Sequence, residues 1–145
     1  MTATAPQQFR KLAYDILQVG EEFISNDHLV TPEDVEAYAF AVEDFNSWFL
    51  GESPFGGSVA HPTLLGNLAL HLRHSKYIVR AGLHAKMRFE FLEPVRVGTR
   101  VRARGKVVDK YIKRDKHYMV TDYAIEDQDG TPLIRGQFTQ MLLEP

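Results

Sequence analysis

The sequence pattern that most constrains the fold lies in the second half of the chain, where four long segments typical of β-strands follow one another after Gly82. They are expected at residues 84–92, 99–113, 117–127 and 133–143. Between them lie turn sequences, of which residues 127–130 end in the Asp-Gly pair that favours a tight turn. In the second segment, cations alternate with small or apolar residues, which places Arg100, Arg102, Arg104 and Lys106 on one face. These segments predict a sheet.

The first half is predicted to be mainly helical. Thr31 to Asp34 is typical of a helix start, with Thr31 as the cap, Pro32 in the first turn and two acids at the positive end of the dipole. The helix that follows should present one apolar face made of Val35, Tyr38, Ala39, Val42 and Phe45. A longer apolar helix is expected from His61 to about Tyr77, a short helix at residues 7–17, and a first strand at residues 22–30. Helices before a sheet predict one α+β domain spanning residues 1–145.

A loop rich in glycine joins the two helical segments. Residues 50–60 contain three glycines and a proline, which break any regular pattern. Before the loop stand Asp44 and Asn46, and after it stands His61. Together with Gly56, Gly57 and Ala60, these residues match a motif of the MaoC-like hydratase/dehydratase family, which includes R-specific enoyl-CoA hydratases and which this chain resembles. The resemblance implies the hot-dog fold, an antiparallel sheet wrapped around a long central helix.

The resemblance also implies a chemistry, the hydration of an enoyl thioester. In the family, an Asp and a His hold one water, and a backbone N–H at the start of the central helix receives the charge that builds on the thioester carbonyl. Asp44 matches the catalytic aspartate. The family's catalytic histidine falls on Phe49, which cannot transfer a proton, and Pro62 removes the N–H of the family's glycine. The motif is therefore broken at two of its positions.

These departures lead to two catalytic candidates, Asp44 and His61. His61 can serve as the second acid/base if the loop folds it toward Asp44, which the sequence neither requires nor forbids. The Thr63 amide is the next donor available to a carbonyl. The residues expected to bind substrate are Asn46, Trp48, Phe49, Gly57, Thr63 and His84. Three of them also have a structural explanation: Asn46 suits a helix end, and Trp48 and Phe49 suit the core or a dimer seam. No metal or cofactor is expected.

Three functions remain open. The first is an acyl-thioester hydratase or dehydratase with altered acid/base residues. The second is a non-catalytic hot-dog subunit that shapes the substrate tunnel of a catalytic partner, since the resemblance associates a missing histidine and a proline-containing loop with such subunits. The third is a hot-dog thioesterase, which needs an acid on the central helix. Residues 61–77 contain no acid, which counts against the third.

Composition limits the partners. The net charge of −2 and a pI near 6.3 give no general attraction to nucleic acid or to an anionic membrane. The row of cations at residues 100–106 fits either a rim for the phosphates of coenzyme A or of a carrier-protein arm, or a solvated face balanced by acids. The absence of cysteine excludes disulfides and thiolate metal sites. A cytoplasmic protein that dimerises with itself or with a related hot-dog chain is expected.

Overall fold

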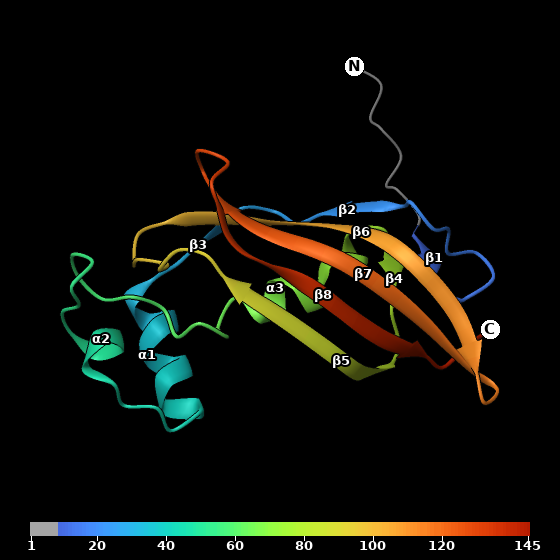
Figure 1. The fold of residues 1–145 in the computed structure, drawn as a ribbon, viewed down its shortest axis with the longest axis horizontal. Helices are drawn as coiled ribbons and strands as arrows, with labels where there is room; N and C mark the ends of the chain where they lie inside the picture. The colour runs from blue at the N-terminus through green and yellow to red at the C-terminus, as the bar shows by residue number, and fades with distance from the viewer. Residues whose placement is uncertain (1–8) are drawn as a thin grey trace, which may run out of the picture.

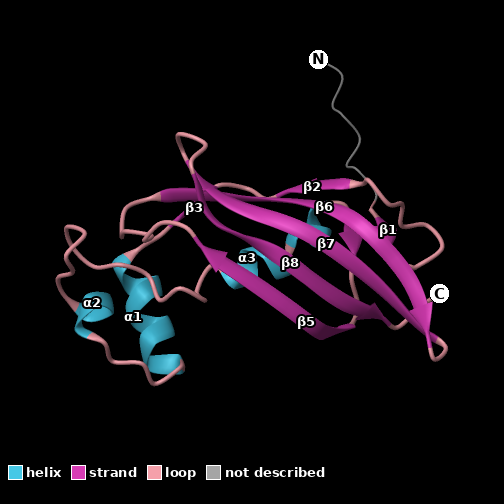
Figure 2. Cartoon of the chain, in the orientation of Figure 1, coloured by secondary structure: helices cyan, strands magenta, loops and turns pink. Residues whose placement is uncertain are grey.

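The computed structural model describes residues 9–145 of the chain. Within that range, an antiparallel six-stranded sheet runs in the order β2-β6-β7-β8-β5, with β3 also paired to β6. Its strands are β2 (Glu22–Ile24), β3 (His28–Leu29), β5 (Gly82–Phe91), β6 (Arg100–Lys113), β7 (Lys116–Asp127) and β8 (Pro132–Leu142). The helices are α1 (Pro32–Ala41), α2 (Ser47–Leu50), α3 (Gly66–Leu70) and the 3-10 helix η1 (Leu72–Ser75). Figures 1 and 2 show α3 against one face of the sheet and α1 and α2 together beyond one end of it.

The four long strands confirm the sequence prediction closely. Strands β5 to β8 begin and end within two residues of the predicted bounds. In β6, Val101, Ala103 and Val107 are buried while the cations between them face outward. At the predicted turn, Asp127 Oδ1 accepts the amides of Asp129 and Thr131, and Gly130 adopts a positive φ of 79°. Alternation and turn chemistry are local, so the sequence alone specifies them.

The long central helix is the main departure from prediction. Instead of one helix over residues 61–77, the chain makes tight turns at residues 62–65, then α3 and η1. Many of its amides bond three residues back, as Leu68 does to the Leu65 carbonyl at 3.0 Å. Gly66 lies so close to β5 that an added Cβ would stand 2.8 Å from the Phe89 ring. Close packing on the sheet therefore outweighs helix continuity, although the predicted apolar residues Leu65, Ala69 and Leu72 are buried.

The helix predicted at residues 7–17 is wrong over the part that the structure describes; residues 7 and 8 lie outside it. The segment forms strand β1 (Arg10–Lys11), which pairs in parallel with β4 (Tyr77–Ile78). The Leu12 amide then donates to the Ile78 carbonyl at 2.9 Å, and the Tyr14 amide to the Glu144 carbonyl at 3.3 Å. Distant segments satisfy these donors, so tertiary pairing replaces the local helix. The predicted strand at residues 22–30 is present but divided into β2 and β3.

A glycine on β8 allows the sheet to close over its core. Gly136 lies between Tyr123 on β7 and Phe89 on β5, and the Tyr123 hydroxyl donates to the Arg88 carbonyl across it at 3.0 Å. A Cβ at Gly136 would stand 1.9 Å from the Arg88 carbonyl oxygen. Only glycine fits between the two strands that neighbour β8. Their close approach at Gly136 brings the buried Tyr123 and Phe138 and the half-buried Phe89 into one core.

Candidate active site

The end of α1 positions Asp44. The Thr31 hydroxyl accepts the Asp34 amide at 3.1 Å and begins the helix as predicted. At the other end, Glu43 adopts a left-handed conformation with φ 56°, and the amides of Glu43 and Asp44 donate back to the Phe40 and Ala39 carbonyls. This is a Schellman arrangement in which glutamate occupies the position that usually holds glycine. It ends the apolar face early, so Val42 and Phe45 are exposed rather than buried.

Asn46 shapes the turn that follows. Its side-chain oxygen accepts the Trp48 amide at 3.0 Å and caps α2, while its own amide lies 3.4 Å from Asp44 Oδ1. Asn46 is therefore linked to Asp44 through the backbone, and its side chain is used as a helix cap. This geometry agrees with the structural explanation for Asn46.

The glycine loop brings His61 back to Asp44. The Ser58 hydroxyl donates to the Gly51 carbonyl, and the Val59 amide donates to the Trp48 carbonyl at 2.9 Å. The Ala60 amide then bonds to the Val95 carbonyl at 2.7 Å, which fixes the chain just before His61. As a result His61 Nε2 lies 3.2 Å from Asp44 Oδ2. The loop thus brings the two candidate catalytic side chains into contact.

The environment of this pair is half-open. The His61 side chain is 18% exposed and that of Asp44 is 45% exposed, so a small molecule can reach the carboxylate. The imidazole lies against two aromatic rings, Phe49 at 5.1 Å and Tyr38 at 5.4 Å between centroids. Phe49, which stands where the family places its histidine, packs directly on the histidine that is present.

A second set of contacts holds the other side of the imidazole. The Thr63 amide donates to His61 Nδ1 at 3.2 Å, and Thr63 Oγ1 lies 3.0 Å from the same nitrogen. Tyr38 on α1 reaches Thr63 Oγ1 at 2.7 Å. The Thr63 amide is therefore engaged by the imidazole, whereas the sequence predicts it as a donor to a thioester carbonyl. Tyr38 was missed as a site residue because its spacing with Val35 and Ala39 assigns it to the core face.

The remaining predicted residues make contacts of their own. Trp48 is exposed and packs edge-on to Phe55 at 5.6 Å. Gly57, with φ 95°, closes a small turn in which its carbonyl accepts from Ser53. His84 lies near the start of β5 with Nε2 3.2 Å from the Lys86 carbonyl. Among residues 9–145, no hydrogen bond, ion pair or aromatic contact joins Trp48, Gly57 or His84 to Asp44 or His61.

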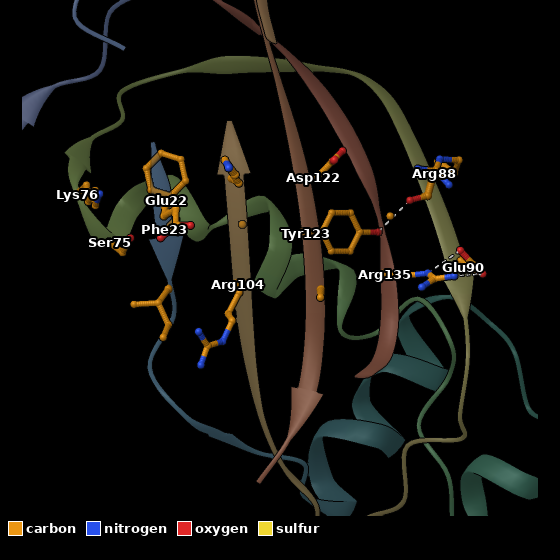
Figure 3. Close-up of a pocket in the computed structure, with 15 residues that line it drawn as sticks. Glu22, Phe23, Ser75, Lys76, Arg88, Glu90, Arg104, Asp122, Tyr123 and Arg135 are labelled. Atoms are coloured by element: carbon orange, nitrogen blue, oxygen red, sulfur yellow. Dashed lines mark hydrogen bonds and ion pairs between the residues drawn. The ribbon is translucent and has the colours of Figure 1, made fainter. Parts of the chain in front are cut away.

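Two of the β6 cations, Arg104 and Lys106, line an open cavity of about 790 Å³ that neither Asp44 nor His61 lines (Figure 3). Two of the four cations, Arg102 and Arg104, share one acid. Glu126 accepts from Arg102 at 3.2 Å and from Arg104 at 2.6 Å, and these hydrogen bonds hold the pKa of its carboxyl below the ordinary value. On the same cavity Arg135 makes a two-pronged pair with Glu90, with both bonds 2.9 Å long. For Arg102 and Arg104 this geometry agrees with a solvated face balanced by acids, whereas none of the ion pairs among the described residues includes Arg100 or Lys106.

A smaller apolar cavity of about 270 Å³ is lined by residues that flank His61 in the sequence, although not by His61 or Asp44 themselves. Ala60 and Pro62, the neighbours of His61, line it together with Phe55, Phe91, Val95 and Ile134. In the part of the chain that is described, no group of three or more potential metal ligands occurs. Likewise, none of the helices there is long and apolar enough to cross a membrane.

Comparisons with known proteins identify the family. The family model of the FAS1-like dehydratase domain region matches residues 17–135. Comparison with curated proteins finds no significant match.

Solved structures give the fold. The R-hydratase PhaJ1 of Pseudomonas aeruginosa superposes with a TM-score of 0.80 at 18% identity, covering 96% of this chain and 90% of that one. The (R)-hydratase of A. caviae involved in PHA biosynthesis gives 0.74 at 24%, covering 88% and 98%. The HadBC (3R-hydroxyacyl-ACP dehydratase) complex of Mycobacterium tuberculosis gives 0.74 at 22%, covering 85% and 96%. The chain therefore has the hot-dog fold of the MaoC-like hydratases and belongs to the FAS1-like dehydratase domain region family.

Proposed function

We propose that this protein is a hydro-lyase that adds water to, or removes it from, an acyl thioester of the enoyl type, with Asp44 as the acid/base and His61 as the residue that holds the water beside it. The observation that carries the proposal is the 3.2 Å contact between His61 Nε2 and Asp44 Oδ2 in a half-open site. A carboxylate and an imidazole in contact can together bind one water, and the carboxylate can exchange protons with it. Family membership and the likeness to hydratases support the same reaction class.

The proton balance of hydration fits these two groups. The water oxygen forms a bond to the β-carbon of the enoyl group as the carbon–carbon π bond breaks. Asp44 takes one proton from that water and, as a carboxylic acid, then gives its proton to the α-carbon. His61 Nε2–H donates a hydrogen bond to the water oxygen throughout, so the carboxylate and the neutral imidazole both end in their starting states. Dehydration is the reverse sequence on the same two residues.

The apolar cavity lined by Ala60 and Pro62, the two neighbours of His61 in the sequence, supports an acyl substrate. Its walls are mainly aliphatic and aromatic, as expected for a pocket that holds the carbon chain while polar groups act at its mouth. Phe49 takes the place of a proton-transfer group in this arrangement and instead forms a wall against His61. The carrier of the thioester is coenzyme A or an acyl-carrier protein, since either presents the same thioester to the site.

One observation favours a second candidate, a non-catalytic subunit of a heteromeric dehydratase. Phe49 cannot transfer a proton, and the Thr63 amide is bonded to His61 rather than open to a carbonyl. A site with no free carbonyl donor would shape a substrate tunnel without turning substrate over. The HadBC complex is a dehydratase made of two different chains and has a similar fold.

Exchanging the carboxylate tests the proposed chemistry. Asp44→Asn keeps the size of the side chain and the acceptor of the Asn46 amide but removes the base, so turnover of a panel of enoyl thioesters should fall by about 10²–10⁴. Asp27→Asn, an exposed acid outside the site, is the matched control and should leave turnover unchanged. Wild-type turnover in the Asp44→Asn variant would refute the mechanism. Binding without turnover, with activity gained only when a second hot-dog chain is added, would establish the subunit alternative.

We also propose that the chain dimerises through β5. This ten-residue strand lies at one end of the sheet order and pairs within the described residues only with β8, so one row of its backbone groups is open. Leu83 and Phe91 on it are exposed apolar side chains. Light scattering at micromolar concentration should give the mass of a dimer, with itself or with a related chain supplied in the mixture. A monomer under both conditions would contradict this.

A further inference from the structure

We infer that Tyr38 and Thr63 are positioning residues that keep the exchangeable proton of neutral His61 on Nε2, the nitrogen that faces Asp44. The inference rests on the proposed function for its catalytic meaning, although the proton position is a property of the folded protein that can be measured without substrate. It adds two residues to the site, one from the middle of α1 and one from the turn after His61.

The backbone donor favours one direction of the network, and the two hydroxyls add to that preference. An amide N–H can only donate, and the Thr63 amide points at His61 Nδ1 with an N···N distance of 3.2 Å. Nδ1 accepts this bond with its lone pair, and a neutral imidazole with a lone pair on Nδ1 carries its proton on Nε2. That proton faces Asp44 Oδ2 at 3.2 Å.

The two hydroxyls extend the same direction. Thr63 Oγ1, 3.0 Å from Nδ1, donates its hydrogen to the same lone pair. Its remaining lone pairs then accept the Tyr38 O–H at 2.7 Å. One consistent order follows, from Tyr38 to Thr63 to His61 to Asp44, in which every donor meets an acceptor. The opposite tautomer would place an N–H against the Thr63 amide and a lone pair against the Asp44 carboxylate.

Tyr38 also holds the imidazole in position. Its ring lies 5.4 Å from that of His61 and tilted by 57°, and Phe49 is the other aromatic neighbour at 5.1 Å. The Tyr38 hydroxyl bridges to a residue 25 positions later in the chain, so it ties α1 to the start of the central segment. The consequence for the proposed reaction is that His61 presents an N–H donor, and not a lone pair, to the water held by Asp44.

Nitrogen NMR of protein labelled with ¹⁵N-histidine tests this inference directly, with the His61 signals identified by their loss in His61→Gln. Wild-type His61 should show a protonated Nε2 and an unprotonated Nδ1 at a pH where it is neutral. Tyr38→Phe and Thr63→Val, which remove the hydroxyls and keep the shapes, should each shift the His61 signals toward a mixture of the two tautomers. Thr63→Ser keeps the hydroxyl and should restore the wild-type signals.

Turnover provides the second readout. Tyr38→Phe and Thr63→Val should lower kcat by about five- to tenfold, the factor that one lost hydrogen bond typically represents, with KM within twofold. Tyr118→Phe is the matched control. Tyr118 is a half-buried tyrosine on β7 that stacks on Tyr111 of β6, so its change should alter neither the His61 signals nor kcat.

Failure of this inference is distinguishable from failure of the proposed function. A wild-type His61 with its proton on Nδ1, or unchanged His61 signals in both hydroxyl-deletion variants, would overturn the positioning role whatever the activity. If wild-type protein turns over no enoyl thioester, the proposed function falls, while the NMR result still decides whether Tyr38 and Thr63 set the tautomer.

Discussion

The strands and the helical segment at residues 32–63 differ in what their side chains do. In the sheet, apolar side chains turn inward to a common core, and many of the outward charges are paired, as in Arg104 with Glu126 and Arg135 with Glu90. In the helical segment, Phe40, Phe45 and Trp48 remain exposed, and polar contacts link Asp44, His61, Thr63 and Tyr38. The sheet therefore buries many more apolar side chains than this segment does, and the segment holds the candidate site.

This division implies that changes to the sheet should mainly alter stability, whereas changes to the segment should mainly alter the site. The largest stability effect is expected at Gly136 on β8, which lies between Tyr123 on β7 and Phe89 on β5. In Gly136→Ala the new methyl group meets the Arg88 carbonyl, which is backbone and cannot move aside, so unfolding free energy should fall by at least about 3 kcal/mol. Urea unfolding followed by circular dichroism measures this.

Gly105→Ala is the matched control for that change. Its Cβ would also be crowded, but its nearest neighbour, at 2.7 Å, is the Leu72 Cδ1 methyl, at the end of a flexible side chain. A smaller loss of about 1–2 kcal/mol is expected. Equal losses in the two variants would show that backbone crowding at Gly136 does not distinguish it from any other core glycine.

Alkaline pH should lower the free energy of unfolding through two tyrosines on strands, Tyr77 on β4 and Tyr123 on β7. Burial and the hydrogen bond to Glu21 raise the pKa of Tyr77 from 10.0 to about 12, and burial raises that of Tyr123 to about 12. Because the folded pKa is the higher one, the stabilisation is complete below pH 10 and is lost as pH rises from 10 to 12. The loss should be about 1–2 kcal/mol per tyrosine after allowance for solvent screening.

Denaturant unfolding at a series of pH values from about 9 to about 12 would measure that loss, because this interval covers the ordinary and the raised pKa of both tyrosines. Tyr77→Phe and Tyr123→Phe should each flatten the decline, since phenylalanine does not titrate. A decline of wild-type steepness in the double variant would assign the alkaline loss to other groups.

The smallest effect, and one of opposite sign, is expected in the helical segment at Glu43. Glu43→Gly relieves a left-handed backbone conformation that glycine adopts without strain, so stability should rise by about 0.5–1 kcal/mol. Glu36→Gly, at an exposed position inside the same helix, should instead lower stability by about 1 kcal/mol. Thermal unfolding of the pair gives both signs. Destabilisation by both changes would mean that the Glu43 side chain, and not its backbone, matters at the helix end.

Local chemistry determined much of the fold. The four long strands, the Asp127 turn and the Thr31 cap each depend on residues a few positions apart, which is why alternation and capping rules locate them. The failures occur where distant segments compete with local preference. Residues 10–12 pair with residues 77–78 instead of forming a helix, and Gly66 packs on Phe89 where a continuous helix was expected.

The candidate site divides in the same way. The sequence by itself determined that Asp44 follows a capped helix and that Phe49 cannot transfer a proton. Only the tertiary structure decided that the glycine loop returns His61 to within 3.2 Å of Asp44, and that Tyr38 reaches Thr63 from another element. Those contacts depend on how the loop is held by the Trp48 and Val95 carbonyls, and no periodicity in the chain encodes such long-range hydrogen bonds.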